Sequence, residues 1–503
     1  MRPQQNKLRF LWLAIFAGLA FFVSGRWQFP AAAWVAPIFA LRFYRDSEKG
    51  GRAFLWLWLA TAVPTIFAWH NATAMHFMGA VIEPVFFIAT IPIGLIPYAV
   101  DRLYHRRWVR DGRFPFWLTL VFPISMTAVD FFSASGSPFG SFGAAAYSQT
   151  GFTTLMQVTA VTGLWGISFI VNWFASTVSY AWGNNWQWAT ITRGLAIYLG
   201  VMALILGWSY GRLAMADTPQ KEVQIGGFSL PEGGLGSMMT LLNNGDEDAF
   251  RQATADMNAR QLAQIQSMAQ AGAQIVVLQE GAGVGFAEEI DTLLTDAAHL
   301  AQTEGIYIVL PTAQLDAAGE EPLHNIVRII DPNGDVVLEH VKYGGNQFEG
   351  SLPGSGELQT VETPYGKLSA VICWDADFPV TMMQAGQQEV DLLFVPSNDW
   401  LEVRDIHAGM ATFRAVENGV SLFRQTGDGV SVVTDGYGRI VNRVDMFEDD
   451  AAGDWSNEQM VLTPIGSVNS LYPQIGDGFG LLSLIGLVGL LIFAWVKRKS
   501  KEA

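Results

Sequence analysis

The stretch Ser369-Ala-Val-Ile-Cys-Trp-Asp-Ala-Asp-Phe-Pro379 carries the only cysteine in this chain of 503 residues. Its first residues are apolar, so they predict a strand that delivers the Cys373 thiol to the start of a loop. A lone cysteine can form neither an intramolecular disulfide nor a multi-cysteine metal site. Cys373 is therefore either a nucleophile or a small hydrophobic residue of the core.

Long apolar runs on both sides of this stretch predict a membrane protein. Half of the residues are hydrophobic and 15% are charged, and most of the runs approach the roughly 20 residues that a helix needs to cross a bilayer. We expect seven spans before a large polar segment and one after it, with the first two forming a tight hairpin. The runs cover residues 8–24, 29–41, 53–69, 77–100, 114–132, 155–182, 192–210 and 479–496.

Charge divides the chain at the same places. Residues 212–475 hold 38 acidic and 12 basic residues, whereas the rest of the chain holds 8 acidic and 18 basic ones. We therefore expect a transmembrane bundle over residues 1–211, a catalytic-type soluble domain over 212–475, and a transmembrane helix with a basic tail over 476–503. A domain this acidic is unsuited to nucleic acid, whose phosphates require a basic surface.

Basic residues also predict how the chain is oriented in the membrane, because cytoplasmic loops are rich in lysine and arginine. If every basic cluster faces the cytoplasm, the alternation of the eight spans places residues 212–475 on the extracytoplasmic side. The clusters precede the first span, follow the second and the fourth, and end the chain: Arg2, Lys7, Arg9; Arg42, Arg45, Lys49, Arg52; Arg102, Arg106, Arg107, Arg110, Arg113; Lys497, Arg498, Lys499, Lys501.

Within residues 212–475, β-rich runs alternate with helical patterns, which predicts a layered α/β domain. Three of the expected strands end at Glu280, Lys342 and Cys373. Functional groups of layered α/β sheets gather at strand ends, so these three side chains are expected to share a site. The expected strands cover residues 222–230, 274–279, 306–310, 325–330, 336–341, 368–372 and 391–395, and the expected helices cover 248–271 and 406–418.

A carboxylate, an amine and a thiol form a chemically consistent set. The thiolate is the attacking form of cysteine, a carboxylate can accept and return its proton, and an ammonium group can stabilise a developing oxyanion. Taken singly, a glutamate or a lysine at a strand end is more often a solvated side chain. Together at three strand ends, the residues favour a functional site.

Glu280, Lys342 and Cys373 resemble the Glu-Lys-Cys triad of the nitrilase superfamily. With seven spans before this domain and one after it, nearly the whole chain resembles the apolipoprotein N-acyltransferase family. Further support comes from the Cys-x-x-x-x-Phe-Pro pattern from Cys373 to Pro379, from Ser397-Asn398-Asp399 followed by Met410-Ala-Thr-Phe-Arg-Ala-Val-Glu-Asn418, and in the membrane half from Trp27-Gln-Phe-Pro-Ala-Ala-Ala-Trp34 and Phe142-Gly-Ala-Ala-Ala-Tyr-Ser-Gln149.

The resemblance implies an α-helical membrane bundle of about eight transmembrane helices joined to a nitrilase-like α-β-β-α sandwich. It implies that Cys373 attacks a membrane phospholipid and carries the fatty-acyl chain as a thioester. The α-amino group of a diacylglyceryl-cysteine lipoprotein would then accept the acyl chain. Glu280 would act as general base, and Lys342 would stabilise the oxyanion together with the backbone N–H that follows Cys373.

The same resemblance implies a monomer in the bacterial inner membrane that needs no metal and no organic cofactor. The seven histidines show no metal-ligand spacing, which agrees. The eight spans have a purpose in this interpretation, because both substrates are anchored in the membrane.

Further residues are expected beside the triad. Glu349 resembles the family's second acidic residue, displaced by one position, and the alternative is a solvated loop side chain. Trp374 and Asp375 stand where the family usually has Tyr-Glu, and they are expected to support the site or bind substrate. The segment Pro231-Glu-Gly-Gly-Leu-Gly236 lacks the family's usual tryptophan, which places the departures around the substrate pocket.

Three polar residues of the predicted helix 406–418 are expected outside the site. Arg414 and Glu417 are expected to pair at positions i and i+3 of the helix. His407 is expected to cap the helix start or to face solvent.

Two other functions fit parts of the sequence. A membrane-anchored carbon–nitrogen hydrolase of the amidase type would resolve the thioester with water, which the Trp374-Asp375 change favours and the number of spans disfavours. A non-catalytic membrane protein with an inert nitrilase-like domain is the third possibility. Glu83 and Asp130 lie in apolar runs, and charges within a bilayer indicate function, but an inert domain could have lost the triad positions that this chain keeps.

Overall fold

The computed structural model describes residues 3–109, 113–216, 221–448 and 455–502. The chain divides into two compact units. The first comprises residues up to Ser137, residues 141–216 and residues from Ile475 onward, and the second comprises Pro138–Gly140 and residues 217–474.

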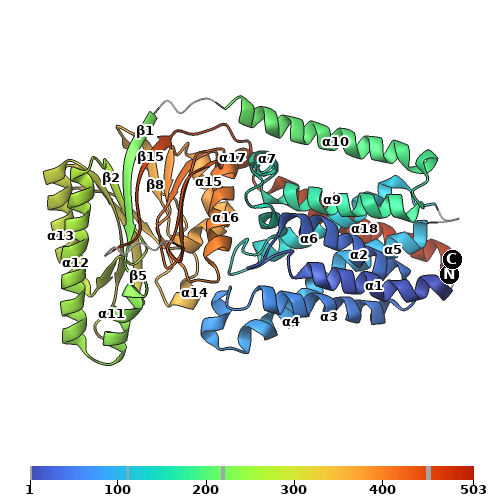
Figure 1. Ribbon diagram of the computed structural model, residues 1–503, viewed down its shortest axis with the longest axis horizontal. Coiled ribbons are helices and arrows are strands. Elements are labelled where there is room, and N and C mark those ends of the chain that lie inside the picture. The colour runs from blue at the N-terminus through green and yellow to red at the C-terminus, as the bar shows by residue number, and fades with distance from the viewer. Residues whose placement is uncertain (1–2, 110–112, 217–220, 449–454, 503) are drawn as a thin grey trace. The chain divides into compact units, whose positions relative to one another are not determined.

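The first unit is a bundle of helices, and every predicted apolar run contains one (Figure 1). By length and composition alone, five helical segments of the described chain could cross a membrane: Gly50–Ala68, Ile82–Trp108, Phe116–Ser135, Trp188–Ala214 and Gly478–Lys497. The other three predicted runs form shorter or more polar helices, so the predicted number of eight is approximate. The main helices are α1 (Pro3–Ala20), α2 (Pro30–Asp46), α3 (Gly50–Ala68), α4 (Ile82–Gly94), α5 (Ile96–Trp108), α6 (Val121–Ser135), α9 (Leu164–Gly183), α10 (Trp188–Ala214) and α18 (Gly478–Glu502).

Three carboxylates of this bundle bind other side chains or the backbone. The guanidinium of Arg45 on α2 and the carboxylate of Asp101 on α5 form a buried pair at 2.7 Å. Glu83 accepts hydrogen bonds from the backbone N–H of Asn71 and from the hydroxyl of Thr73. Asp130 accepts from the Ser168 hydroxyl at 2.6 Å. Burying a charge is costly unless it is paired, and these contacts give Glu83 and Asp130 a structural role.

The second unit contains two large mixed sheets, one of seven strands and one of six. The first sheet has the order β15-β1-β2-β4-β5-β6, with β3 beside β4, and the second has the order β14-β13-β11-β9-β8-β7. All seven predicted strands are present. Their bounds are β1 Lys221–Ser229, β2 Ile275–Leu278, β3 Gly283–Gly285, β4 Tyr307–Gln314, β5 His324–Ile330, β6 Val336–Val341, β7 Val361–Thr363, β8 Gly366–Ala370, β9 Leu392–Phe394, β11 Ser421–Arg424, β13 Val430–Thr434, β14 Ile440–Asp445 and β15 Ser456–Ile465.

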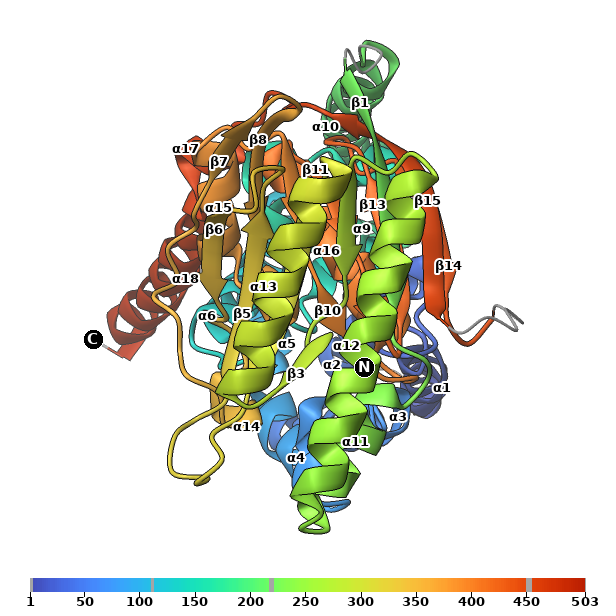
Figure 2. The same cartoon turned by 90° about the vertical axis from the view of Figure 1, so that its left-hand side faces the viewer.

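Helices cover the outer face of each sheet, which makes the four-layer α-β-β-α sandwich that was expected. Helices α12 (Glu247–Gln270) and α13 (Ala287–Glu304) lie across the first sheet (Figure 2). Helices α15 (Pro379–Gln387) and α16 (Arg404–Asn418) pack on the second. The central core lies between the sheets, where Val277 and Val309 of the first meet Leu368 and Phe394 of the second.

Strand direction explains why the three candidate residues meet. In the first sheet, β2 runs parallel to β4, β5 runs antiparallel to β4, and β6 runs antiparallel to β5, so β2 and β6 end at the same edge. In the second sheet, β8, β9 and β11 are mutually parallel and also end at one edge. Hydrogen bonds join the two edges: the N–H of Glu280, two residues after β2, donates to the carbonyl of Ser397, which follows β9.

Candidate active site

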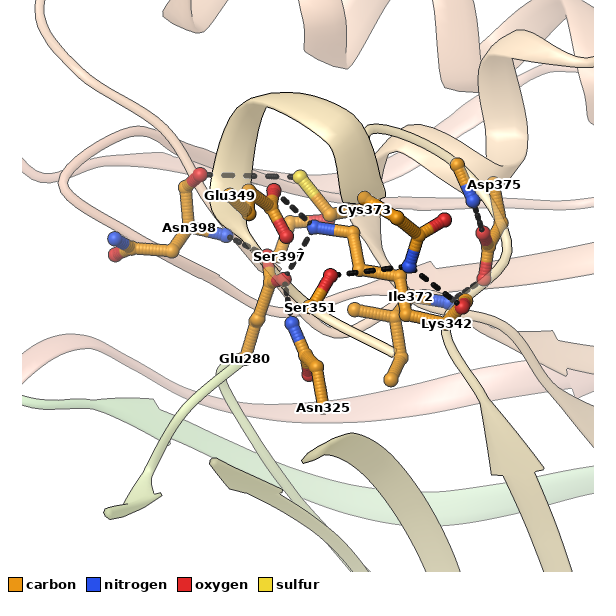
Figure 3. Close-up of polar contacts among 12 residues, drawn as sticks. Glu280, Asn325, Lys342, Glu349, Ser351, Ile372, Cys373, Asp375, Ser397 and Asn398 are labelled. Carbon is orange, nitrogen blue, oxygen red and sulfur yellow. Dashed lines mark hydrogen bonds and ion pairs between the residues drawn. The ribbon is translucent and has the colours of Figure 1, made fainter. Parts of the chain in front are cut away.

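Lys342 is the centre of a buried ion-pair cluster (Figure 3). It directly follows β6, and its side chain is fully buried. Its Nζ lies 2.7 Å from Oε1 of Glu280 and also donates a hydrogen bond to Glu349. Burial alone lowers the pKa of Lys342, but the charges of Glu280 and Glu349 outweigh it and hold the pKa well above its usual value. Lys342 is therefore a permanent buried cation.

Two asparagines fix the orientation of the Glu280 carboxylate. Asn325, at the start of β5, donates its side-chain amide to Glu280 Oε1 at 2.7 Å. The backbone N–H of Asn398 donates to Oε2 at 3.1 Å. Both oxygens are thus anchored, one by Asn325 of β5 and the other by Asn398 in the segment after β9. A carboxylate held in this way is a pre-oriented proton acceptor.

Cys373 is held in an unusual backbone conformation. Its φ angle is +47°, in the left-handed region that side chains other than glycine rarely adopt. Its N–H donates to the carbonyl of Pro396 at 2.9 Å, and its Sγ lies 3.8 Å from the carbonyl oxygen of Asn398. Asn398 therefore contacts both Glu280, through its N–H, and Cys373, through its carbonyl.

The Cys373 thiol is neutral in the resting site. Burial raises its pKa, the nearby charge of Glu280 raises it further, and Lys342 and His407 lower it without reversing the net rise. A neutral thiol attacks poorly, so reaction requires a base.

Glu349 joins the same cluster through its contact with Lys342 and also keeps part of its side chain open to solvent. It ends the short helix α14 (Asn346–Glu349), and its side chain is 29% exposed. Burial raises the pKa of this carboxyl, and the attraction of Lys342 only partly offsets the rise. Two carboxylates thus share one ammonium group, and the cluster carries an excess of negative charge beside the thiol.

Asp375 is a fully buried brace between two loops. Its Oδ1 accepts hydrogen bonds from the N–H groups of Tyr343 and Gly344, at 2.8 and 2.6 Å. Its Oδ2 accepts from the N–H of Ile372 at 2.9 Å and lies 2.8 Å from Nε2 of His340. The carboxylate thereby ties the loop after Lys342 to the turn that carries Cys373.

Replacing Asp375 by asparagine is expected to destabilise the second unit. The amide can supply only one acceptor oxygen, so its NH2 group faces backbone N–H groups or the imidazole in a buried site. We expect a loss of about 1–3 kcal/mol in the free energy of unfolding. Thermal unfolding measures it, and a variant as stable as the wild type would contradict the brace.

Trp374 packs against aromatic rings and does not open to solvent. Its ring centroid lies 5.8 Å from that of Phe348 and 6.0 Å from that of Phe139, one of the three residues that the 138–140 loop contributes to this unit. Lys342 Nζ lies 5.9 Å from the Trp374 ring centroid. At Gly345 a Cβ would come within 1.8 Å of the Trp374 ring, so only glycine fits there.

The helix that follows the site gives one confirmed prediction and one correction. Arg414 and Glu417 pair at 3.0 Å as predicted, and both are fully buried. His407 neither caps the helix nor faces solvent: it is 4% exposed, and its ring nitrogens contact Asp399 and Asp377. The prediction was wrong because a helical pattern does not reveal which loops pack on its buried face.

Asn325 and Asn398 were also not assigned roles from the sequence. Asn325 could have been found, because it is a polar residue at the start of a predicted strand that pairs with the strand leading to Lys342. The contact of Asn398 with Glu280 uses backbone N–H, which is independent of the side chain and leaves no signal in the sequence.

Two protein families match this chain. Residues 13–177 match the apolipoprotein N-acyltransferase N-terminal domain, and residues 232–453 match the carbon–nitrogen hydrolase domain. An apolipoprotein N-acyltransferase of Geobacter metallireducens is 21% identical over 420 residues, which cover 76% of this chain and 75% of that protein. One of Borreliella burgdorferi is 25% identical over 157 residues, which cover 30% of this chain and 29% of that protein.

A solved structure also matches about half of this chain. An amidase from Nesterenkonia sp. is 18% identical, with a TM-score of 0.37, and the match covers 52% of this chain and 95% of the amidase.

Proposed function

This chain belongs to the apolipoprotein N-acyltransferase family of the nitrilase superfamily, and from that premise we propose that it moves a fatty-acyl chain from a membrane phospholipid to the N-terminal α-amino group of a diacylglyceryl-cysteine lipoprotein. The observation that carries the proposal is the buried Glu280–Lys342 pair beside a lone, neutral thiol. The arrangement has an acceptor for the thiol proton and a fixed cation for the oxyanion.

In the first step, Glu280 accepts the Cys373 proton and the sulfur attacks the ester carbonyl of the phospholipid. The carbonyl oxygen gains negative charge, which Lys342 stabilises together with a backbone N–H. The N–H of Cys373 itself donates to Pro396, so the N–H of Trp374 is the one assigned to this oxyanion. The C–O bond then breaks, Glu280 returns the proton to the departing lysophospholipid, and a thioester remains on Cys373.

In the second step, the lipoprotein amine attacks the thioester. An α-amino group has a pKa near 8 and is partly neutral at physiological pH, so its attack is feasible without prior activation. Glu280 accepts the proton that the amine loses as the amide forms. The C–S bond breaks, and the proton passes to the sulfur, which restores the thiol.

The basic clusters support an orientation with residues 212–475 on the extracytoplasmic side of the bacterial inner membrane. This orientation would place the site where lipid-modified lipoproteins present their N-termini. A cysteine accessibility experiment tests it: in spheroplasts, a membrane-impermeant maleimide should label a cysteine introduced at exposed Glu288 and spare one introduced at exposed Glu48. The reverse pattern would contradict the orientation.

The acyl-enzyme itself is the most direct test of the proposed function. Incubation of the purified protein with phospholipid should add the mass of one fatty-acyl chain to the intact protein, removable by neutral hydroxylamine. Adding a diacylglyceryl-cysteine peptide should discharge the adduct onto the peptide, with the peptide gaining the acyl mass. Discharge into free fatty acid in the presence of the peptide would favour the hydrolase, and no adduct at all would contradict both.

A further inference from the structure

A second buried charge network lies against the nucleophile, on elements that the triad does not use. His407 lies in the first turn of α16, and Asp377 and Asp399 are buried in the turns after Cys373 and after β9. His407 Nδ1 lies 2.8 Å from Asp399 Oδ1, and Nε2 lies 3.2 Å from Asp377 Oδ1. Arg424 Nη2, from β11, donates to both oxygens of Asp399 at 3.0 Å.

These contacts favour a protonated imidazole. A carboxylate oxygen has no proton to donate, so each ring nitrogen that faces one must carry its own hydrogen. Without its hydrogen, Nδ1 could accept a hydrogen bond from Arg424 Nη2, which lies 3.2 Å away. Its lone pair would then face a lone pair of Asp399 Oδ1 at 2.8 Å, and the two would repel. Burial lowers the pKa of His407, whereas Asp377 and Asp399 outweigh it and hold the pKa well above its usual value. His407 is thus an imidazolium that cannot serve as a base.

The imidazolium lies next to the sulfur. A ring nitrogen of His407, Sγ of Cys373 and a carboxylate oxygen of Asp399 are all within 4.8 Å of one another. Hydrogen bonding and the charge of His407 both act on the thiol to favour its ionised form. The charges of two buried cations, Lys342 and His407, therefore act on the thiol.

The charge balance explains why a second cation is useful. With both carboxyl groups ionised, Glu280, Glu349 and Lys342 together carry one net negative charge while the thiol is neutral. When the thiol proton moves to Glu280, the net charge of the four side chains stays the same. The negative charge of Glu280 is replaced by one on the sulfur. In a buried site, an anion of this kind is costly without a nearby cation. Lys342 is already shared between two carboxylates and must also stabilise the oxyanion.

We propose that His407 is a further catalytic residue of this site, a buried imidazolium that stabilises the Cys373 thiolate when it forms to attack the phospholipid and when it leaves the thioester. Asp377, Asp399 and Arg424 are positioning residues that hold the ring and keep it charged. The proposal rests on the proposed function for its role in turnover, but its effect on the thiol exists in the resting protein and is measured there.

The test follows alkylation of Cys373 by iodoacetamide as a function of pH. Because Cys373 is the only cysteine, the adduct mass reports this thiol alone. His407→Gln removes the cation but also leaves Asp377 uncompensated, so the informative variant is His407→Gln combined with Asp377→Asn, which keeps the network neutral and hydrogen-bonded. We expect its alkylation midpoint to rise by about one pH unit, which is about a tenfold slower reaction at neutral pH.

A purely structural role for His407 predicts a different result. The neutral double variant would then unfold at a lower temperature than the wild type but be alkylated with the wild-type pH profile, and an unchanged profile overturns the proposal. His299→Gln, at an exposed histidine of α13, is the matched control and should leave the profile unchanged.

Asp377→Asn alone keeps the proposal testable if the double variant does not fold. Asp399, 2.8 Å from Nδ1, still holds the proton on His407, so the network gains a net positive charge and the alkylation midpoint should fall. An unmoved midpoint overturns the proposal. The readout involves no lipid, so its result stands whether or not the acyl-enzyme forms. Conversely, absence of the acyl adduct from the wild type contradicts the proposed function and leaves the thiol result intact.

Discussion

Replacing Cys373 by alanine is expected to abolish acyl transfer while the protein still folds. The sulfur is the proposed covalent attachment point of the acyl chain, and no second thiol exists to replace it. Removal of a catalytic nucleophile lowers turnover by about a millionfold. The side chain is small, and its replacement removes one atom from a core that both sheets build. Transfer of labelled acyl chains from phospholipid to a lipopeptide measures the loss.

The chemistry of a serine variant distinguishes this result from a packing defect. Any acyl chain on Cys373→Ser would be bound as an oxygen ester, which neutral hydroxylamine releases far more slowly than a thioester. Both variants should unfold close to the wild-type temperature. If Cys373→Ala still acquired a hydroxylamine-labile acyl chain, the thioester would be located elsewhere and the proposed mechanism would fail.

Replacing Lys342 by methionine is expected to cost both activity and stability. Methionine has a similar length, but it leaves the Glu280 and Glu349 carboxylates facing each other without the ammonium group that both bind. Breaking a buried ion pair from one side costs about 3–5 kcal/mol. Acyl-enzyme formation should cease, because the oxyanion loses its cation. The melting temperature should recover partly on acidification, since protonating one carboxylate removes the repulsion.

Two further variants isolate the cause. Combining Lys342→Met with Glu349→Gln leaves a single carboxylate, so stability should return while acyl-enzyme formation does not. Lys367→Met, at a partly exposed lysine of β8 that pairs with Glu362, is the matched control and should cost less than about 1 kcal/mol. A Lys342→Met protein as stable as this control at neutral pH would contradict the buried-cluster account.

The sequence predicted the parts of the site that strand patterns determine. Glu280 and Cys373 each follow an apolar run that is buried, whereas Lys342 follows β6, whose residues alternate between buried and exposed. Strands of one sheet that run in the same direction end at the same edge. The predicted strand at 336–341 matches β6, so the position of Lys342 followed directly. The position of Glu349 in the cluster was suggested by the family resemblance alone, and the residue pattern left it open.

The rest of the site depends on packing between segments far apart in the chain. His407 contacts Asp377 and Asp399 because α16 covers the second sheet beside the ends of β8 and β9. Nothing in the local pattern of residues 406–418 distinguishes that buried turn from a solvated one. The antiparallel pairing of β15 with β1, more than 200 residues apart, is equally invisible to local periodicity.

The left-handed conformation of Cys373 restricts which residues can replace it. A residue with a side chain costs roughly 1–3 kcal/mol in this region of backbone space, and glycine is the ordinary way to relieve that cost. Here the strained residue is Cys373, whose side chain the proposed chemistry requires. Glycine would relieve the backbone strain but would remove the nucleophile. Compensation must then come from neighbours, such as the Pro396 carbonyl that holds the Cys373 N–H. The segment around Pro396 thus supports the strained turn through a backbone group and not through a side chain.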